Sequence, residues 1–301
     1  MIIYGTLLGY HGARILSITL SPKGDIIVST GTDGYVRFWS IDTGMQEFEI
    51  KAKTTYPMSI AWNYVNNLVA FSDGPIIRIF DMKTGGFLPI LEEHIDVVSS
   101  ICWSPDGRYL ASVGYDGLLI VWDIFKCRKR SSIRVSSGKV LDVAWSSDPI
   151  FIATCDESGK VKIWDITESK LYKKIDAHLG KVSSICWSPN GKFLATGGWD
   201  CLVKVWDVDS LEAFRVFKGF SGDITSISWG PSNDLLAMAS ADGNVIVWNV
   251  TNDEELVKLV QFSGKVVTLK WHPKEFFIAT GSDDGCINVY DVSIINKLLK
   301  E

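Results

Sequence analysis

Histidine is the side chain best suited to bind a metal ion or to move a proton near neutral pH. The sequence has four: His11, His94, His178 and His272. None belongs to an H-E-x-x-H motif or to a cluster of cysteine and histidine, and no G-x-S-x-G motif supplies a nucleophile. The first three recur at one place in a repeated pattern, and the fourth lies in the turn-like "KWHPKE". We therefore expect structural roles for all four, with no catalytic site and no metal site.

Aspartates are the second candidate set, because carboxylates that meet at one place can bind Ca²⁺. They occur in the short sequences TDG, YDG, WDC, ADG and DDG, each six residues before the aromatic residue that ends a strand-like segment. This regular placement indicates that the carboxylates brace turns. We expect no cofactor, no small-molecule substrate and no enzyme activity.

The composition is that of a folded globular protein, since 47% of the 301 residues are hydrophobic and 22% are charged. A net charge of −5 argues against a general binder of nucleic acids or membrane surfaces. Four of the six cysteines, at positions 102, 155, 186 and 286, lie in apolar strand-like stretches, which predicts buried thiols in a reducing compartment. No secretory signal and no membrane-spanning stretch is recognisable. The sequence thus predicts an intracellular protein, cytoplasmic or nuclear, with no membrane partner.

Tryptophan positions reveal a repeat of 42 residues, shortened once to 41. One series comprises Trp62, Trp103, Trp145, Trp187, Trp229 and Trp271. The second comprises Trp39, Trp122, Trp164, Trp206 and Trp248, with Phe80 and Tyr290 in its two gaps. A fixed period of this length is typical of a chain built from stacked units. Trp199 is the twelfth tryptophan and the only one outside both series.

Each repeat carries the signals of short strands. In repeat 5, "VSSICW" and "CLVKVW" alternate with period two, and "SPNG" between them is a turn signal. Four strands per unit and no helical period predict an all-β protein. We expect one seven-bladed β-propeller over residues 1–301, with four-stranded antiparallel blades.

The repeats resemble those of the WD40-repeat β-propeller family, which carry Gly-His early in the unit and Trp-Asp at its end. Here the units end in "FWSID", "IFDMK", "VWDIF", "IWDIT", "VWDVD", "VWNVT" and "VYDVS". The resemblance implies a hydrogen-bonded tetrad of His, Ser or Thr, Asp and Trp inside a blade. Three tetrads are complete: His11, Ser29, Asp33 and Trp39; His94, Ser112, Asp116 and Trp122; His178, Thr196, Asp200 and Trp206.

The other four repeats lack a complete tetrad. The residues that replace its members are Lys53, Ala70 and Phe80 in repeat 2, Ser136 and Ser158 in repeat 4, Phe220 and Met238 in repeat 6, and Phe262 and Tyr290 in repeat 7. Buried polar groups must be satisfied together or replaced together. We therefore expect the loss of Asp116 or Asp200 to destabilise the protein more than the loss of Asp242.

The family resemblance also implies that the N-terminal strand closes the ring by becoming the outermost strand of the last blade. Residues 2–8, "IIYGTLL", are the expected closing strand, and their pairing removes an exposed edge. Residues 293–301, "SIINKLLKE", have a similar register and are the competing segment.

A basic cluster lies at residues 125–133, "FKCRKRSSI". A nucleic-acid or nuclear-import role is one interpretation. We favour a charged outer strand that resists pairing with other chains. The Phe/Leu-Arg-Arg-Gly signature of phosphoinositide-binding propellers and the Trp-Asp-x-Arg of cullin adaptors are both absent from the sequence.

The resemblance finally implies two sets of positions around the opening of one face, here called the top face, which often contact partners. The first set gives Arg14, Tyr56, Lys139, Lys181, Asp223 and Lys265, and the second gives Thr32, Tyr115, Glu157, Trp199, Ala241 and Asp283. An aromatic side chain on a rigid turn is a typical interface anchor, which makes Trp199, Tyr115 and Tyr56 the expected ones. The alternative is that Trp199 packs within its own molecule.

These observations predict a scaffold for contacts with a protein or peptide, monomeric as a propeller within a larger assembly. One alternative is a substrate-receptor subunit of a larger complex such as a ubiquitin ligase. Another is an enzyme or metal-binding propeller that uses its central channel.

Overall fold

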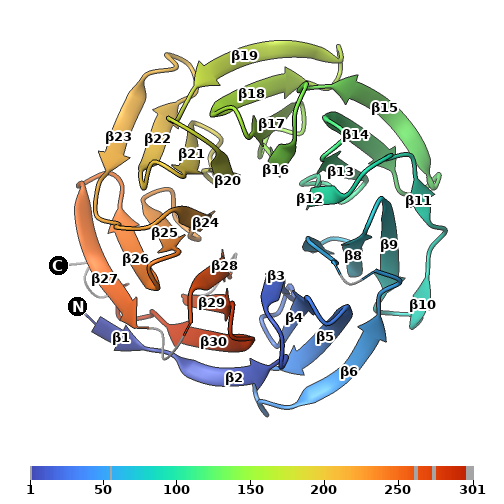
Figure 1. Ribbon diagram of the computed structural model, residues 1–301, viewed down its shortest axis with the longest axis horizontal. Helices are drawn as coiled ribbons and strands as arrows, with labels where there is room; N and C mark the ends of the chain where they lie inside the picture. The colour runs from blue at the N-terminus through green and yellow to red at the C-terminus, as the bar shows by residue number, and fades with distance from the viewer. Residues whose placement is uncertain (1, 55, 261–263, 273–275, 296–301) are drawn as a thin grey trace.

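The 42-residue repeat folds into a small antiparallel sheet, and seven such sheets stand around a central channel as the blades of a propeller (Figure 1). The structure is a computed structural model that describes residues 2–54, 56–260, 264–272 and 276–295. Its elements are thirty β-strands. The predicted all-β, seven-bladed fold is therefore confirmed. No helix within these ranges has the length and apolar character that crossing a membrane requires.

The blades follow one another along the chain. Blade 1 contains β3 (Ile15–Leu20), β4 (Ile26–Gly31), β5 (Tyr35–Ser40) and β6 (Gln46–Lys51). Blade 2 contains β7 (Ile60–Asn63), β8 (Leu68–Asp73), β9 (Ile76–Asp81) and two short strands that both pair with β9, β10 (Gly86–Phe87) and β11 (Leu91–Glu92). Blade 3 contains β12 (Val98–Trp103), β13 (Tyr109–Gly114), β14 (Leu118–Asp123) and β15 (Arg128–Arg134).

The remaining blades repeat this order. Blade 4 contains β16 (Val140–Trp145), β17 (Phe151–Asp156), β18 (Lys160–Asp165) and β19 (Lys170–Asp176). Blade 5 contains β20 (Val182–Trp187), β21 (Phe193–Gly198), β22 (Val203–Asp207) and β23 (Ala213–Phe217). Blade 6 contains β24 (Ile224–Trp229), β25 (Leu235–Ser240), β26 (Asn244–Asn249), β27 (Glu254–Val260) and, beside β27, β1 (Ile2–Tyr4). Blade 7 contains β28 (Val266–Trp271), β29 (Phe277–Ser282), β30 (Cys286–Asp291) and β2 (Thr6–Tyr10).

The hydrophobic core lies between blades rather than within them. Each of the seven apolar clusters joins residues of two neighbouring blades. Between blades 2 and 3, for example, Leu68 and Ile77 pack with Trp103, Leu110 and Trp122. The second strand of each blade is covered on both sides and is buried nearly throughout, as β13 is, whereas the outer strand β15 is mostly exposed. Because each blade relies on both neighbours, the core is complete only when the ring is closed.

The two tryptophan series have different tasks. Three of the tryptophans that end first strands tie their blade to the preceding one: the Nε1 atoms of Trp103, Trp187 and Trp229 donate to the carbonyls of Ala61, Ala144 and Cys186 at 3.0, 3.1 and 3.3 Å. Trp62 and Trp145 instead donate to Asn67 and Pro149 of their own blades. Four of the tryptophans that end third strands bond within their own blade: Trp39, Trp122, Trp164 and Trp206 each donate to a second-strand hydroxyl at 2.8–3.0 Å. The regular spacing of the tryptophans therefore reflects positions that recur in every blade, and at several of them the same hydrogen bond recurs.

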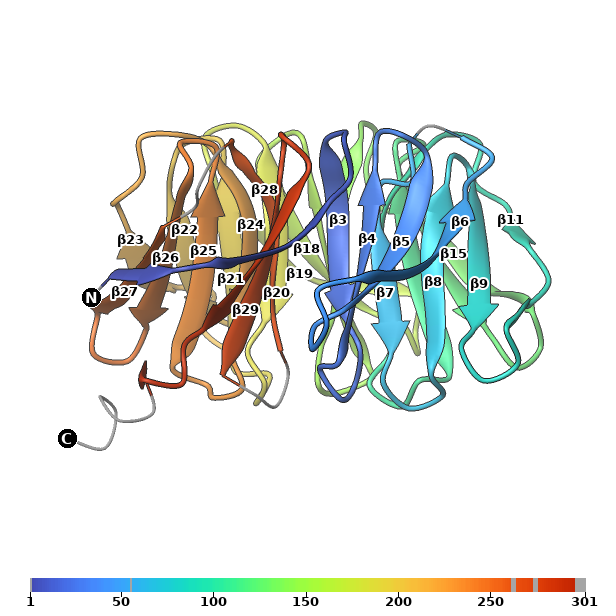
Figure 2. The same ribbon diagram turned by 90° about the horizontal axis from the view of Figure 1, so that it is seen from below.

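The N-terminal segment closes the ring, but with boundaries that differ from those expected. The strand that completes blade 7 is β2, residues 6–10, which pairs antiparallel with β30. Residues 2–4 instead form β1, which pairs in parallel with β27 of blade 6. Gly5 joins them where a Cβ would lie 2.7 Å from the ring of Tyr290. Figures 1 and 2 show both strands on the outer circumference, so the chain's first residues connect two blades instead of one.

The burial of the cysteines differs from the expected burial. Of the four cysteines predicted to be buried, only Cys155 is; Cys102 and Cys186 are half-buried on the channel wall, and Cys286 is half-buried. The physical reason is that "SICWS" belongs to the first strand, one side of which faces the channel. The rival closing segment, residues 293–301, lies largely outside the described residues.

Candidate protein-binding face and central channel

A backbone hydrogen bond repeats at one end of six blades and builds the top face. It runs from the turn between the second and third strands to the residue before the first strand. The donor–acceptor pairs, each separated by 2.8–3.2 Å, are Thr32–Arg14, Tyr115–Val97, Glu157–Lys139, Trp199–Lys181, Ala241–Asp223 and Asp283–Lys265. The two predicted sets of top-face residues therefore lie side by side. Tyr56 is outside this pattern; it lies in the connection from β6 to β7 with 58% of its surface exposed.

Trp199 stands on a firmly held turn. The next residue, Asp200, accepts hydrogen bonds from the backbone amides of Leu179 and Leu202 at 3.2 and 3.3 Å. The Nζ of Lys181 lies 4.1 Å from the centre of the indole, a favourable cation–π distance. The side chain nevertheless keeps 49% of its surface exposed, so packing within the molecule covers only half of it.

Tyr115, at the equivalent turn of blade 3, is more deeply set. Its ring is half-buried and its hydroxyl donates to the Sδ of Met58 at 3.8 Å, which draws the side chain toward the channel. The Nζ of Lys139, from blade 4, lies 4.4 Å from the ring centre. A lysine thus lies against each of these two aromatic rings. Lys181 comes from the same blade as Trp199, and Lys139 comes from the blade after that of Tyr115.

Two exposed apolar side chains on this face were missed by the sequence analysis. Leu179 is 91% exposed and Ile95 is 83% exposed, the highest values among the large apolar side chains of the described residues. Both directly follow a tetrad histidine, and their backbone amides donate to the tetrad aspartates Asp200 and Asp116. The signal was present in the sequence as "HLG" and "HID", where the first repeat has a glycine.

The three predicted tetrads form one hydrogen-bond relay each. In blade 3, the Nε1 of Trp122 donates to the Oγ of Ser112 at 2.8 Å, and His94 bonds to Ser112 and to Asp116, both at 2.8 Å. Corresponding contacts are 2.7–3.0 Å among His178, Thr196, Asp200 and Trp206, and 2.7–3.3 Å among His11, Ser29, Asp33 and Trp39. A neutral histidine satisfies this relay, because its Nδ1–H can donate to Asp while its Nε2 accepts from the hydroxyl.

Blade 1 adds an arginine to this relay. The guanidinium of Arg37 contacts Asp33 and the Nδ1 of His11, and it also pairs with Glu49 at 3.0 Å. Burial, assisted by the positive charge of Arg37, lowers the pKa of His11 to about 4. Burial also lowers the pKa of His94 and of His178. All three imidazoles are therefore neutral in the folded protein at neutral pH.

These lowered pKa values predict a loss of stability in mild acid. An unfolded histidine takes up a proton as the pH falls through 6.5, whereas folded His11 does so only near pH 4. The unfolded state then binds more protons, so the free energy of unfolding falls as the pH is lowered through this window. We expect the midpoint of urea unfolding to decrease from about pH 7 to about pH 5. A midpoint independent of pH in this range would contradict neutral tetrads.

Blades 2 and 4 retain an aspartate that the sequence analysis overlooked. It comes from the end of the second strand rather than from the turn. Asp73 accepts hydrogen bonds from the amides of Lys53 and Thr54, both at 2.8 Å, and Asp156 accepts from the Oγ of Ser136 at 3.1 Å. Blades 2 and 4 therefore keep an aspartate that accepts hydrogen bonds, although its position in the blade differs from that in a complete tetrad. In blade 6, apolar side chains replace two polar members of the tetrad: Met238 is fully buried and Phe220 packs beside it.

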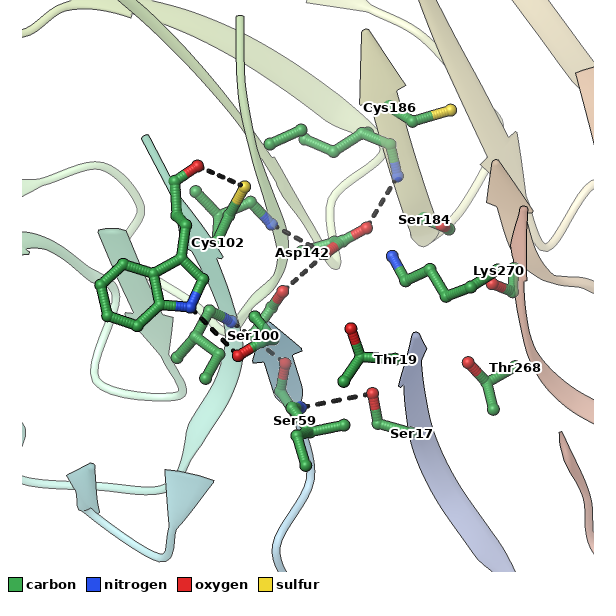
Figure 3. Close-up of a pocket in the computed structure, with 18 of the residues that line it drawn as sticks. Ser17, Thr19, Ser59, Ser100, Cys102, Asp142, Ser184, Cys186, Thr268 and Lys270 are labelled. Carbon is green, nitrogen blue, oxygen red and sulfur yellow. Dashed lines mark hydrogen bonds between the residues drawn. The ribbon is translucent and has the colours of Figure 1, made fainter. Parts of the chain in front are cut away.

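The central channel is lined by a ring of hydroxyls. The cavity measures about 460 Å³. One equivalent position in each blade, in the first strand or, for Ser59, directly before it, contributes to the ring. Its occupants are Ser17, Ser59, Ser100, Asp142, Ser184, Ser226 and Thr268, all but Ser226 labelled in Figure 3. Several bond to the next blade: Ser59 accepts from the amide of Ile101 at 3.1 Å, and Ser184 accepts from the amide of Ile227 at 3.3 Å. Hydrogen bonds of the ring thus connect neighbouring blades.

Asp142 is the exception in this ring. Its carboxylate accepts hydrogen bonds from the Oγ of Ser100 at 2.7 Å and from the amides of Val143 and Ile185 at 2.9 Å. Burial raises its pKa, and the positive charge of Lys270, which also lines the channel, opposes that rise (Figure 3). Among the described residues that line the channel, Asp142 is the one carboxylate. Within the part of the chain that the structure describes, no group of three or more His, Cys, Asp or Glu side chains is placed to hold a metal ion.

Comparison with known proteins identifies the family. A family model described as WDR19 first beta-propeller matches residues 141–294, just over half of the chain. A second, described as WD domain, G-beta repeat, matches residues 3–40 and 85–123. The chain belongs to the WD40-repeat family.

The individual relatives match a smaller share of this chain than the first family model does. The small ribosomal subunit protein RACK1 of Schizosaccharomyces pombe is 28% identical over 127 residues, which cover 38% of this chain and 40% of that protein. The target of rapamycin complex subunit wat1 of the same organism is 27% identical, over 36% of each chain. The COMPASS component SWD3 of Saccharomyces cerevisiae is 26% identical, over 38% of this chain and 39% of its own. The match therefore spans only about two fifths of each of these relatives.

Proposed function

We propose that this WD40 propeller is a scaffold that binds a protein or peptide on its top face. The observation that carries the proposal is a set of apolar and aromatic side chains on two rigid blades: Ile95 on blade 3 and Leu179 and Trp199 on blade 5 are exposed, and Tyr115 on blade 3 is half-buried. Side chains of this kind, fixed on held turns, bind partners at little cost in conformational entropy. The relatives support it, since their names describe subunits or components of assemblies.

Several finer features belong to the same proposal. The anchors are Trp199, Tyr115 and Tyr56, and the charged residues that surround them are Arg14, Lys139, Lys181, Asp223 and Lys265. The protein is not an enzyme, and it acts inside the cell as one propeller within a larger assembly. Six free cysteines are in keeping with a reducing compartment.

A binding experiment with matched variants tests the proposal. Replacing Trp199 and Tyr115 with alanine should abolish the capture of partners from native lysate while leaving the melting temperature nearly unchanged, because Trp199 is half-exposed and Tyr115 half-buried at the surface. The control replaces Met45 and Phe125, each 69% exposed in turns at the opposite end of their blades, with alanine. The control should retain every partner. Equal capture by wild type and both variants would overturn the top-face proposal.

A further inference from the structure

A basic pocket lies at the outer edge of blade 3, at the end of β13 opposite to Tyr115. Its volume is about 320 Å³. Tyr109 and Asp123 line it together with five cationic side chains, Arg108, Lys126, Arg128, Lys129 and Arg130. All five are exposed, although the chain as a whole is acidic. The pocket therefore concentrates positive charge at one place on a protein of opposite charge.

A β-bulge that recurs in the outer strands positions one of these cations. In blades 3, 4 and 5 the register between the third and fourth strands shifts before the strand-end tryptophan. The outer-strand residue left without a partner is Arg130, Tyr172 or Phe214, respectively. A bulge redirects the side chain of the extra residue. Here it turns that side chain over the residue that opens the second strand.

Arginine replaces an aromatic ring at this bulge in blade 3. Tyr172 lies 4.7 Å from Phe151, and Phe214 lies 4.9 Å from Phe193, measured between ring centres. In blade 3 the Cζ of Arg130 lies 4.5 Å from the ring centre of Tyr109. The fold would accept an aromatic residue here, so the guanidinium is not needed to fill the space.

The positive charges of the pocket are only partly compensated. Asp123 pairs with Arg108 at 3.5 Å and with Lys126 at 4.0 Å, and Lys129 pairs with Glu93 at 2.8 Å. The Cζ of Arg108 also lies 5.2 Å from the ring of Tyr109, which places two guanidinium groups on one aromatic side chain. Within the described ranges, Arg128 and Arg130 form no ion pair with a carboxylate. Gathering such groups is unfavourable unless an anion joins them.

We propose that this basic pocket binds a phosphomonoester carried on a protein segment, such as a phosphorylated serine. A phosphomonoester has close to two negative charges and three acceptor oxygens, and planar guanidinium groups match those oxygens in pairs. Single-stranded nucleic acid is a poorer fit. It needs a basic track several nucleotides long, whereas the five cations here line one pocket of about 320 Å³ and the chain's net charge of −5 repels a long polyanion. The pocket lies apart from the top face, so this inference does not depend on the function proposed above.

Fluorescence anisotropy with a labelled glycine–serine peptide carrying one central phosphoserine tests the proposal. The wild-type protein should bind it about tenfold more tightly than the unphosphorylated peptide. The double variant Arg128→Gln, Arg130→Phe should lose about tenfold in affinity. Phenylalanine at position 130 restores the aromatic pair of blades 4 and 5, so the melting temperature should hold. If this variant fails to fold, Arg128→Gln alone replaces it, since Arg128 is exposed.

Lys174→Gln is the matched control, because Lys174 is an exposed cation on the outer strand of the next blade. It should change the affinity by less than about twofold. Inorganic phosphate should displace the peptide, since the phosphate is the group recognised. An equal loss in the control, or equal binding of the unphosphorylated peptide, would overturn the proposal. Tighter binding of a single-stranded oligonucleotide or of a soluble inositol phosphate would overturn it in favour of that ligand.

Discussion

Replacing Asp116 with alanine should lower the free energy of unfolding by about 4 kcal/mol, because it leaves a buried relay without its acceptor. The carboxylate of Asp116 is fully buried. It accepts hydrogen bonds from the Nδ1 of His94 at 2.8 Å and from the amides of Ile95 and Leu118 at 3.1 and 3.0 Å. Without it, two amides and an imidazole lose their partner in a place that admits little water. Urea unfolding followed by tryptophan fluorescence measures the loss.

Asp242→Ala is the matched control for this experiment. Asp242 occupies the same turn in blade 6 and accepts hydrogen bonds from the amides of Ser221 and Asn244, both at 2.9 Å. It is exposed, however, and its blade has Phe220 and Met238 in place of the polar members of a tetrad. Water can replace the lost carboxylate, so we expect a loss of about 1 kcal/mol. A loss at Asp242 as large as that at Asp116 would contradict the role assigned to the complete tetrads.

Gly9→Val should destabilise the protein by about 3 kcal/mol, because the added side chain forces β2, the strand that closes the ring, away from the core beneath it. A Cβ at Gly9 would lie 2.7 Å from the indole of Trp39. That indole cannot move aside, since it is buried and its Nε1 donates to Ser29 at 2.8 Å. Displacement of β2 would also expose the edge of β30 to other chains. Size-exclusion chromatography should therefore reveal aggregation along with the lower urea midpoint.

Gly86→Val provides the comparison at an outer strand with free space. Gly86 lies in β10, and a Cβ there would meet only the side chain of Thr84, at 3.6 Å. We expect a change within about 0.5 kcal/mol. If both valine variants were equally stable, the tight contact between β2 and Trp39 would not be essential to ring closure.

The architecture was predictable because the features that define it recur along the sequence. Trp122 and Trp206 make the same hydrogen bond in different blades, so the spacing of such tryptophans along the sequence predicts the repeat. The closing strand was predicted only in part. "IIYGTLL" is continuous in apolar character, and nothing in it shows that Gly5 divides it between two blades.

Parts of the candidate sites were hidden for a different reason. The exposure of Leu179 depends on a turn that holds its backbone and leaves its side chain in solvent, which composition does not reveal. The importance of Arg130 depends on a bulge that moves it out of register, whereas the sequence showed only a run of basic residues. Asp73 and Asp156 were overlooked because they are shifted by one or two places from the turn position used for the prediction.

The position of β2 has a consequence for how the protein is made. Residues 6–10 are synthesised before the strands of blade 1, whereas their partners in β30 are synthesised after all the other strands. Blades 1 to 6 can pack on one another during synthesis, while β2 has no pairing strand until β30 is made. Among the strand pairs of the described residues, pairing β2 with β30 closes the longest loop, so it is the pairing with the greatest entropic cost of loop closure. A strand made before blade 1 is therefore used only when blade 7 forms, and the ring of a nascent chain stays open until β30 has been synthesised.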